Sequence, residues 1–168
     1  TELKKGRNEL FLKSVRSWMD ATIRASVVPH KLYEVDLAAE IEVRMRRAGN
    51  EGSPRGRGFN QEFFMGLAIA GDAASAPSYF DGPVTGRGLS ASSPLGASTD
   101  VVGRDVPVLL DYTAIRAGYV TDMTRIAVCG RLAPELERAF RVARDVQDEV
   151  AAGLVPGAVP SALFAAAV

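Results

Sequence analysis

The stretch from Val106 to Gly130 constrains the fold more strongly than any other part of the chain. Two runs rich in Val, Ile, Leu, Thr and Tyr flank a break at Arg116-Ala117-Gly118. This pattern is typical of a β-hairpin, because β-branched and aromatic residues favour strands and a glycine-containing break favours a turn. A loop of Arg116-Ala117, or of the four residues 115–118, predicts that Asp111 faces Asp122 directly across the two strands.

Two carboxylates in direct opposition repel each other, since the Cβ atoms of facing residues lie about 4.5 to 5.5 Å apart. Proteins answer such a clash with a raised pKa on one carboxylate or with a divalent cation between the two. The apolar neighbours predict a half-buried hairpin, in which bare charges are costly; they are Tyr112, Ile115, Val120, Met123 and Ile126. We therefore favour the cation.

A second interpretation of the hairpin stays open. The turn has no Asn-Gly pair, which is the sequence signal that fixes a hairpin register best. A register shifted by one residue, or a longer loop, would leave both aspartates in solvent, where charged residues usually sit.

Composition limits the class of protein. The 168 residues suffice for one domain, and 20 Lys plus Arg balance 20 Asp plus Glu, so no net charge recruits nucleic acid or a membrane. The single cysteine, Cys129 on the second hairpin strand, rules out a disulfide framework and fits a reducing compartment. No apolar run approaches 18 residues, and residues 1–7 lack a signal-peptide core. We expect a soluble cytoplasmic protein.

Hydrophobic periodicity predicts the remaining elements. Helices are expected over residues 9–26, 34–48, 134–152 and 160–168, and a strand buried on both faces over 63–70. Residues 51–60 and 71–103 are rich in turn-forming residues, and loops of that length often surround a functional site. Trp18 is expected in the core and His30, the only histidine, on a surface turn rather than on a metal.

The segments that follow the predicted helices 9–26 and 134–152 have similar sequences. Residues 27–39 read V-V-P-H-K-L-Y-E-V-D-L-A-A, and residues 154–166 read L-V-P-G-A-V-P-S-A-L-F-A-A. Aligning Pro29 with Pro156 places Leu37 on Phe164. This short match suggests one complete unit of helices and sheet, followed by the start of a second.

These residues resemble the pita-bread family of dinuclear metallohydrolases, which includes methionine aminopeptidase, prolidase, Xaa-Pro aminopeptidase and creatinase. The family pattern D-x-G followed by G-Y-x-x-D-x-T-R is similar to residues 111–113 and 118–125, and the two aspartates stand eleven residues apart, as in the family. Further likeness lies in P-x-x-x-x-E-x-x-L-A-A at 29–39, G-x-E-G at 49–52 and V-P-G at 155–157. The likeness is greater to prolidase and creatinase than to methionine aminopeptidase.

The resemblance implies an α+β fold with a curved antiparallel sheet flanked by helices, in two pseudo-symmetric halves. The first half would span 8–130, and the second would begin at 134–168 and be truncated. It also implies two divalent metal ions (Mn, Co or Zn), a peptide or dipeptide substrate and a homodimer. Asp111 would bridge the metals in bidentate fashion, and Asp122 on the adjacent strand would bind both.

Three departures from the family pattern matter. The family's other metal ligands, one His and two Glu, would follow residue 168. The resemblance therefore implies a fragment, or the visible part of a longer chain. It identifies no catalytic residue among the 168. The substrate-contacting His of the family's P-H-G falls on Leu95, and the Gly of D-x-G falls on Thr113. The leading expectation is an Xaa-Pro type metallopeptidase; a creatinase-like C-N hydrolase and a non-catalytic peptide- or protein-binding module are the alternatives.

Overall fold

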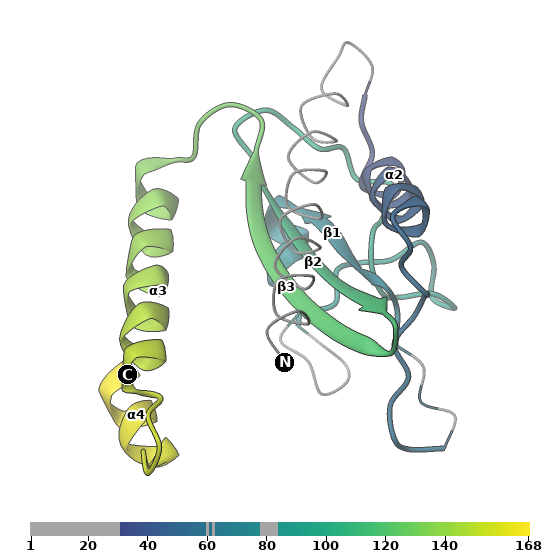
Figure 1. Ribbon diagram of the computed structural model, residues 1–168. Helices are drawn as coiled ribbons and strands as arrows, with labels where there is room; N and C mark the ends of the chain where they lie inside the picture. The colour runs from purple at the N-terminus through teal and green to yellow at the C-terminus, as the bar shows by residue number, and fades with distance from the viewer. Residues whose placement is uncertain (1–30, 60, 62, 78–83) are drawn as a thin grey trace. The chain divides into compact units, whose positions relative to one another are not determined.

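A computed structural model describes residues 31–59, 61, 63–77 and 84–168. The predicted helix over 9–26, with Trp18, and His30 lie outside these residues. The described residues form two compact units, one up to residue 131 and the other from 132 to 168 (Figure 1). The first contains α2 (Glu34–Arg47), β1 (Gly66–Ala70), the 3₁₀ turn η1 (Gly71–Ser75), β2 (Pro107–Arg116) and β3 (Tyr119–Val128); the second contains α3 (Pro134–Gly153) and α4 (Pro160–Ala167).

The three strands form one antiparallel sheet in the order β1-β2-β3. β1 pairs with β2 from Gly66 opposite Tyr112 to Ala70 opposite Val108. The predicted strand is thus confirmed over 66–70, whereas residues 63–65 precede it. The prediction that this strand is buried on both faces is confirmed, since residues 67–70 are all buried.

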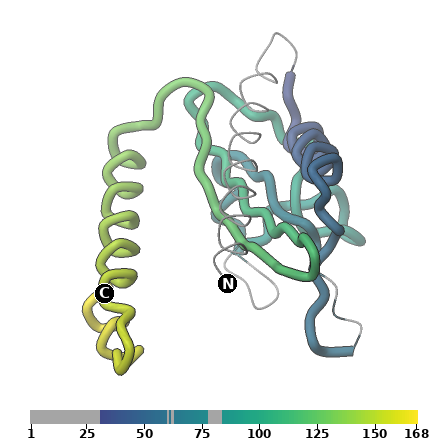
Figure 2. The backbone as a smooth tube through the Cα atoms, viewed as in Figure 1, coloured from purple at the N-terminus to yellow at the C-terminus, as the bar shows by residue number. Residues whose placement is uncertain are grey.

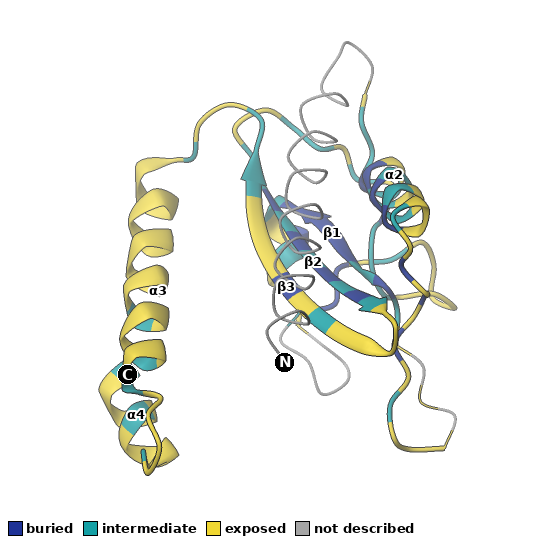
Figure 3. Ribbon diagram, viewed as in Figure 1, coloured by how far each residue is buried: buried dark blue, intermediate teal, exposed yellow. Residues whose placement is uncertain are grey.

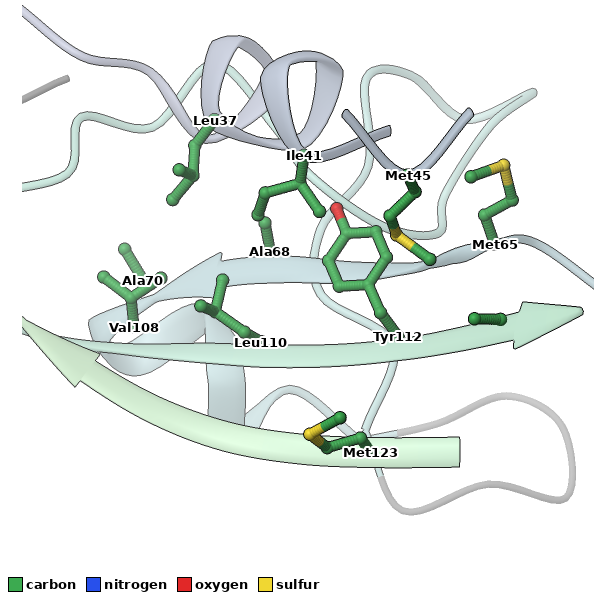
Figure 4. Close-up of a cluster of buried hydrophobic side chains, with 11 residues drawn as sticks. Leu37, Ile41, Met45, Met65, Ala68, Ala70, Val108, Leu110, Tyr112 and Met123 are labelled. Carbon is green, nitrogen blue, oxygen red and sulfur yellow. The ribbon is translucent and has the colours of Figure 1, made fainter. Parts of the chain in front are cut away.

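Helix α2 covers one face of the sheet (Figure 1). Its Leu37, Ile41 and Met45, spaced along one side of the helix as predicted, are each at most 3% exposed. They pack on alternate residues of the strands, because successive side chains in a strand point to opposite faces. Figure 4 shows this cluster, which includes Ala68, Ala70, Val108, Leu110, Tyr112 and Met123.

The opposite face of β1 has its own small core. Leu67 and Ile69 form this core with Ala73 of η1, and Leu95 from the long loop packs against it. The loop, seen as the teal tube in Figure 2, lies close to the strand. Gly86 has φ +72°, and a Cβ there would stand 2.6 Å from the backbone oxygen of Gly96 and 2.8 Å from Ile69 Cδ1, so the position favours glycine.

Helix α2 is closed at its C-terminus by a glycine in the left-handed region. Gly49 has φ +93°, its N–H donates to Arg46 O at 2.9 Å, and Asn50 N–H donates to Met45 O at 3.0 Å. These two bonds satisfy carbonyls that the helix leaves unpaired. The prediction of Gly49 as the capping residue is confirmed.

Glu34, the first residue of α2, is fully buried and joins three parts of the fold. Its Oε1 accepts the N–H of Ala70 at the end of β1, at 2.5 Å. Its Oε2 accepts both the N–H and the hydroxyl of Ser98, each at 2.8 Å. A buried carboxylate is tolerated only with such partners, so Glu34 fixes the start of α2 against the sheet and the loop.

Tyr112 carries a polar group into the main core. Its ring lies beside Gly66 on the neighbouring strand and its hydroxyl points toward α2 between Ile41 and Met45 (Figure 4). Among the described residues the hydroxyl has no hydrogen-bond partner. Burial raises the pKa of the Tyr112 hydroxyl, and the charge of Glu42 adds to this shift.

The second unit consists of α3 packed on α4. Both predicted helices are confirmed within a residue of their expected ends. Every residue from 134 to 168 is at least partly exposed, including Leu136 and Phe140 on the predicted apolar side of α3. None of the helices in the described part of the chain is long and apolar enough to cross a membrane.

Candidate metal centre

The predicted hairpin is confirmed, but the predicted register is wrong by two residues. β2 and β3 are joined by the two-residue turn Ala117-Gly118, and the pairing places Asp111 opposite Thr124 and Thr113 opposite Asp122. Asp111 therefore does not face Asp122 directly. The alternative of a one-residue shift or a longer loop is also wrong, because the pairing differs by two residues and both aspartates lie on the same face of the sheet. Its expectation of solvent exposure holds for Asp122 but not for Asp111, which is half-buried.

The reason for the error lies in the turn. Both turn residues have positive φ, +50° at Ala117 and +75° at Gly118. This is the backbone of a type I′ turn, which sequence predicts well only when both positions favour the left-handed region, as in Asn-Gly. An alanine rarely adopts that conformation. The sequence therefore favoured a loop of Arg116-Ala117 or of residues 115–118.

The two aspartates and two threonines form a four-residue square on the sheet. Each aspartate faces a threonine, and Thr124 Oγ1 donates a hydrogen bond to Asp111 Oδ1 at 2.7 Å. The aspartates occupy one diagonal, where the residues lie roughly 7 to 8 Å apart and their Cβ atoms somewhat closer. The carboxylates therefore repel less than predicted, and a cation is not needed to offset a direct clash.

The square lies in partly apolar surroundings. Asp111 is half-buried and Asp122 is exposed. On the same face Val120 is 59% and Ile126 is 40% exposed, while Tyr112 and Met123 are buried on the opposite face. The predicted half-buried hairpin is confirmed, since the face beneath α2 is buried and the face that carries the aspartates is exposed or half-buried. Figure 3 shows that β3 is the more exposed of the two hairpin strands.

The donor set can supply part of a metal site. Two carboxylates from adjacent strands offer the oxygen ligands that hard divalent cations prefer, and the Thr124 hydrogen bond orients Asp111 as a second-layer partner would. In the described part of the chain, no group of three or more His, Cys, Asp or Glu side chains stands close enough to hold a metal ion. The residues therefore fit a divalent cation as two ligands of a larger set.

Two of the three departures from the family pattern, at Thr113 and Leu95, lie on the aspartate face. Thr113 faces Asp122, so a hydroxyl-bearing side chain stands where the family has a glycine. Leu95 packs against Leu67 and Ile69, and Leu67 is paired with Asp111. The loop that carries Leu95 thus covers the same face of the sheet one strand away, with an apolar side chain at the position of the family's histidine.

Three residues of this region were not singled out from the sequence. Thr124 lies in the T-D-M-T-R run, and Glu51 in the G-x-E-G phrase, so the likeness to the family was the signal available for both. Glu34 is the Glu of the P-x-x-x-x-E-x-x-L-A-A phrase at 29–39, but its hydrogen-bond partners lie 36 and 64 residues away and could not be read from that phrase. Cys129 follows the last residue of β3 rather than lying within the strand.

Comparisons with known proteins identify the family of the chain. The model of metallopeptidase family M24 matches residues 9–168. The chain belongs to this family, and its fold is of the pita-bread type, an antiparallel sheet with flanking helices. No curated protein sequence gave a significant match.

Solved structures of several peptidases are similar in fold. Aminopeptidase PepP of Pseudomonas aeruginosa superposes with a TM-score of 0.59 at 20% identity, over 91% of this chain and 29% of that one. X-Pro aminopeptidase of Thermotoga maritima gives 0.53 at 20% identity over 84% and 35%. Xaa-Pro dipeptidase of Bacillus anthracis gives 0.55 at 20% identity over 80% and 31%. The chain thus spans about a third of the length of the structures it matches.

Proposed function

We propose that this chain is part of a metal-dependent peptidase of the Xaa-Pro type, to which Asp111 and Asp122 contribute metal ligands. The observation that carries the proposal is the placement of both carboxylates on one face of adjacent strands, with Thr124 holding Asp111. Membership of metallopeptidase family M24 supports the reaction class. The names of the structural neighbours, an X-Pro aminopeptidase and an Xaa-Pro dipeptidase among them, support the substrate class.

Two divalent ions, Mn, Co or Zn, are proposed as the cofactor of the complete site. When bound, such ions supply a nucleophilic water at neutral pH and polarise the scissile carbonyl. The described residues would contribute the two oxygen ligands, and the remaining ligands would come from outside the described residues. Residues 8–130 are proposed as one half of the domain and 134–168 as the start of its related half, in a cytoplasmic homodimer acting on peptides or dipeptides.

The proposal is tested on the longest natural chain that contains these 168 residues. The assay is hydrolysis of an Xaa-Pro dipeptide after loading with Mn²⁺, with metal content measured in parallel. We expect chelation to abolish hydrolysis and Asp111→Asn and Asp122→Asn each to lower metal content and activity at least about a hundredfold. Asp145→Asn, on the exposed surface of α3, is the matched control. Activity that survives both chelation and the two substitutions would exclude a metal-dependent reaction at this site.

A non-catalytic peptide- or protein-binding module is the second candidate, and Leu95 favours it. An apolar residue in contact with Leu67 and Ile69 cannot make the polar substrate contact that the family draws from its histidine. If the natural chain binds a proline-containing peptide but does not cleave it with Mn²⁺ present, the binding module is the better description. A panel that also contains small guanidino compounds separates the creatinase-like reaction from the peptidase.

A further inference from the structure

The turn between β2 and β3 is held in a conformation that its own sequence does not favour. Ala117 and Gly118 both have positive φ. Glycine adopts this region freely, whereas the Cβ of an L-alanine crowds the following carbonyl oxygen there. A neighbouring group must therefore stabilise Ala117 for the two-residue turn to form.

Glu51 supplies that group. Its Oε1 accepts the N–H of Ala117 in a short hydrogen bond, and its Oε2 accepts the N–H of Gly118 at 3.4 Å. The carboxylate thus receives both N–H groups of the turn, and a charged acceptor makes such bonds stronger than neutral ones. The contact joins the segment after α2 to a turn 66 residues later in the chain.

Ala48, Asn50 and the backbone of Glu51 form hydrogen bonds with the last two residues of β2, beside the turn. Glu51 N–H donates to Ile115 O at 3.0 Å, and Asn50 Oδ1 accepts the N–H of Ile115 at 2.8 Å. Arg116 Nη1 donates to Ala48 O at 3.1 Å. Each residue from Ile115 to Gly118 is therefore hydrogen-bonded to residues 48–51, and the capped end of α2 fixes where that segment lies.

This contact matters because burial cannot choose between registers that differ by two residues. A slip of one residue moves every side chain of β3 to the wrong face and is opposed by the core. A slip of two residues leaves each side chain on its own face, so the hydrophobic pattern tolerates it. In a pairing that has slipped by two residues, the loop includes Arg116. Asp122 then lies directly opposite Asp111, which brings two like charges together.

We propose that Glu51 is a positioning residue for the Asp111–Asp122 pair. Its carboxylate selects the turn at Ala117-Gly118 and so sets the pairing that keeps the two aspartates diagonal, each facing a threonine. The consequence for metal binding rests on the proposed function, whereas the consequence for the register does not. The Glu51 carboxylate accepts hydrogen bonds from the backbone N–H groups of Ala117 and Gly118, so its role here is to position the turn.

The test uses the 168-residue chain with Glu51→Ala, Glu51→Gln and the double variant Glu51→Ala/Ala117→Asn. Glu40→Gln is the control for loss of a surface carboxylate, because Glu40 pairs with Arg44 on α2, away from the turn. Three NMR measurements are compared. They are amide exchange of Ala117 and Gly118, the Hα–Hα contact of Asp111 with Thr124 or with Asp122, and the Mn²⁺ concentration that half-broadens the two aspartate signals.

For Glu51→Ala we expect Ala117 exchange to rise at least about tenfold and an Asp111–Asp122 contact to appear. The Mn²⁺ concentration should change severalfold, because the slip alters the separation of the two carboxylates. Glu51→Gln keeps one acceptor oxygen and should be intermediate; it also serves if Glu51→Ala does not fold. The double variant should recover wild-type values, because Asn-Gly favours the type I′ turn without help. Glu40→Gln should match the wild type.

The inference is overturned if Glu51→Ala keeps wild-type exchange and the Asp111–Thr124 contact, or if the double variant fails to recover them. If the wild type binds Mn²⁺ and Glu51→Ala binds it equally well, the positioning role fails and the proposed function stands. If the wild-type signals are not broadened by Mn²⁺, the proposed function fails at its metal step, and with it the metal-positioning part of the inference. Exchange and the strand contacts then still decide whether Glu51 sets the register.

Discussion

At the scale of single residues, the Tyr112 hydroxyl is a buried polar group that the described residues leave unpaired. We expect Tyr112→Phe to raise the free energy of unfolding by about 1 kcal/mol, since the desolvation cost of the hydroxyl disappears while the ring remains. Urea denaturation at neutral pH measures the change. A loss of stability instead would mean that the hydroxyl has a partner, and Tyr112→Leu, which removes the ring as well, should be destabilising in either case.

Gly66 leaves the space that the Tyr112 ring occupies. A Cβ at this position would collide with Tyr112 Cδ1 and with the backbone oxygen of Asp111. We expect Gly66→Ala to lower the free energy of unfolding by about 1 to 3 kcal/mol, because both obstacles lie in packed structure. In the double variant with Tyr112→Leu the cost should shrink, and an equal cost in both backgrounds would show that the ring is not the obstacle.

Glu42 on α2 gives a pH-dependent prediction. Burial raises the pKa of Glu42, and the nearby Arg46 guanidinium partly offsets the shift. A raised pKa favours the protonated form in the folded state, so the stability it confers is complete below about pH 4.3, the ordinary Glu value, and is lost as pH rises through the folded-state pKa.

Glu42→Gln should therefore stabilise the protein at pH 7 by less than about 1 kcal/mol, the modest scale of a partly exposed charge. The gain should vanish near pH 4. Urea denaturation at the two pH values measures it, with Glu40→Gln as the control on the same helix. A gain that is equal at both pH values would not be explained by the titration of Glu42.

At the scale of elements, Glu34 connects α2, β1 and the loop at Ser98 through three hydrogen bonds. Glu34→Ala would leave three buried donors without an acceptor, and we expect a loss of about 3 to 5 kcal/mol in the free energy of unfolding. Glu34→Gln should cost less, because the amide oxygen replaces one acceptor. Thermal unfolding followed by circular dichroism measures both, and a loss below about 1 kcal/mol for Glu34→Ala would contradict the connection.

Elements with a strong local pattern were predictable from the sequence, and their mutual placement was not. Spacing of apolar residues located α2, and strand-forming residues located the hairpin. The register was missed because pairings that differ by two residues bury the same side chains, and because the turn depends on Glu51, which lies far away in the sequence. The aspartates were placed on one face correctly, since that depends only on alternation along the strands.

At the scale of the whole molecule, metal binding should be coupled to stability. A ligand that binds only the folded state adds RT ln(1 + [L]/Kd), or about 1 kcal/mol at five times Kd. We expect Mn²⁺ to stabilise the 168-residue chain by this amount only at millimolar concentration, since two carboxylates make a weak site. Asp111→Asn and Asp122→Asn should each remove the effect, which thermal unfolding detects. Stabilisation that persists in both variants would place the ion elsewhere.

The pairing of β1 with β2 has a consequence for how the chain folds. β2 and β3 are adjacent in sequence, whereas β1 reaches β2 only after about 40 intervening residues have closed into a loop. Contacts between distant segments form late because their closure entropy is lost before they gain energy. The hairpin, with the aspartates on it, is therefore expected in the transition state for folding, and β1 is expected to dock only on the downhill side of the barrier.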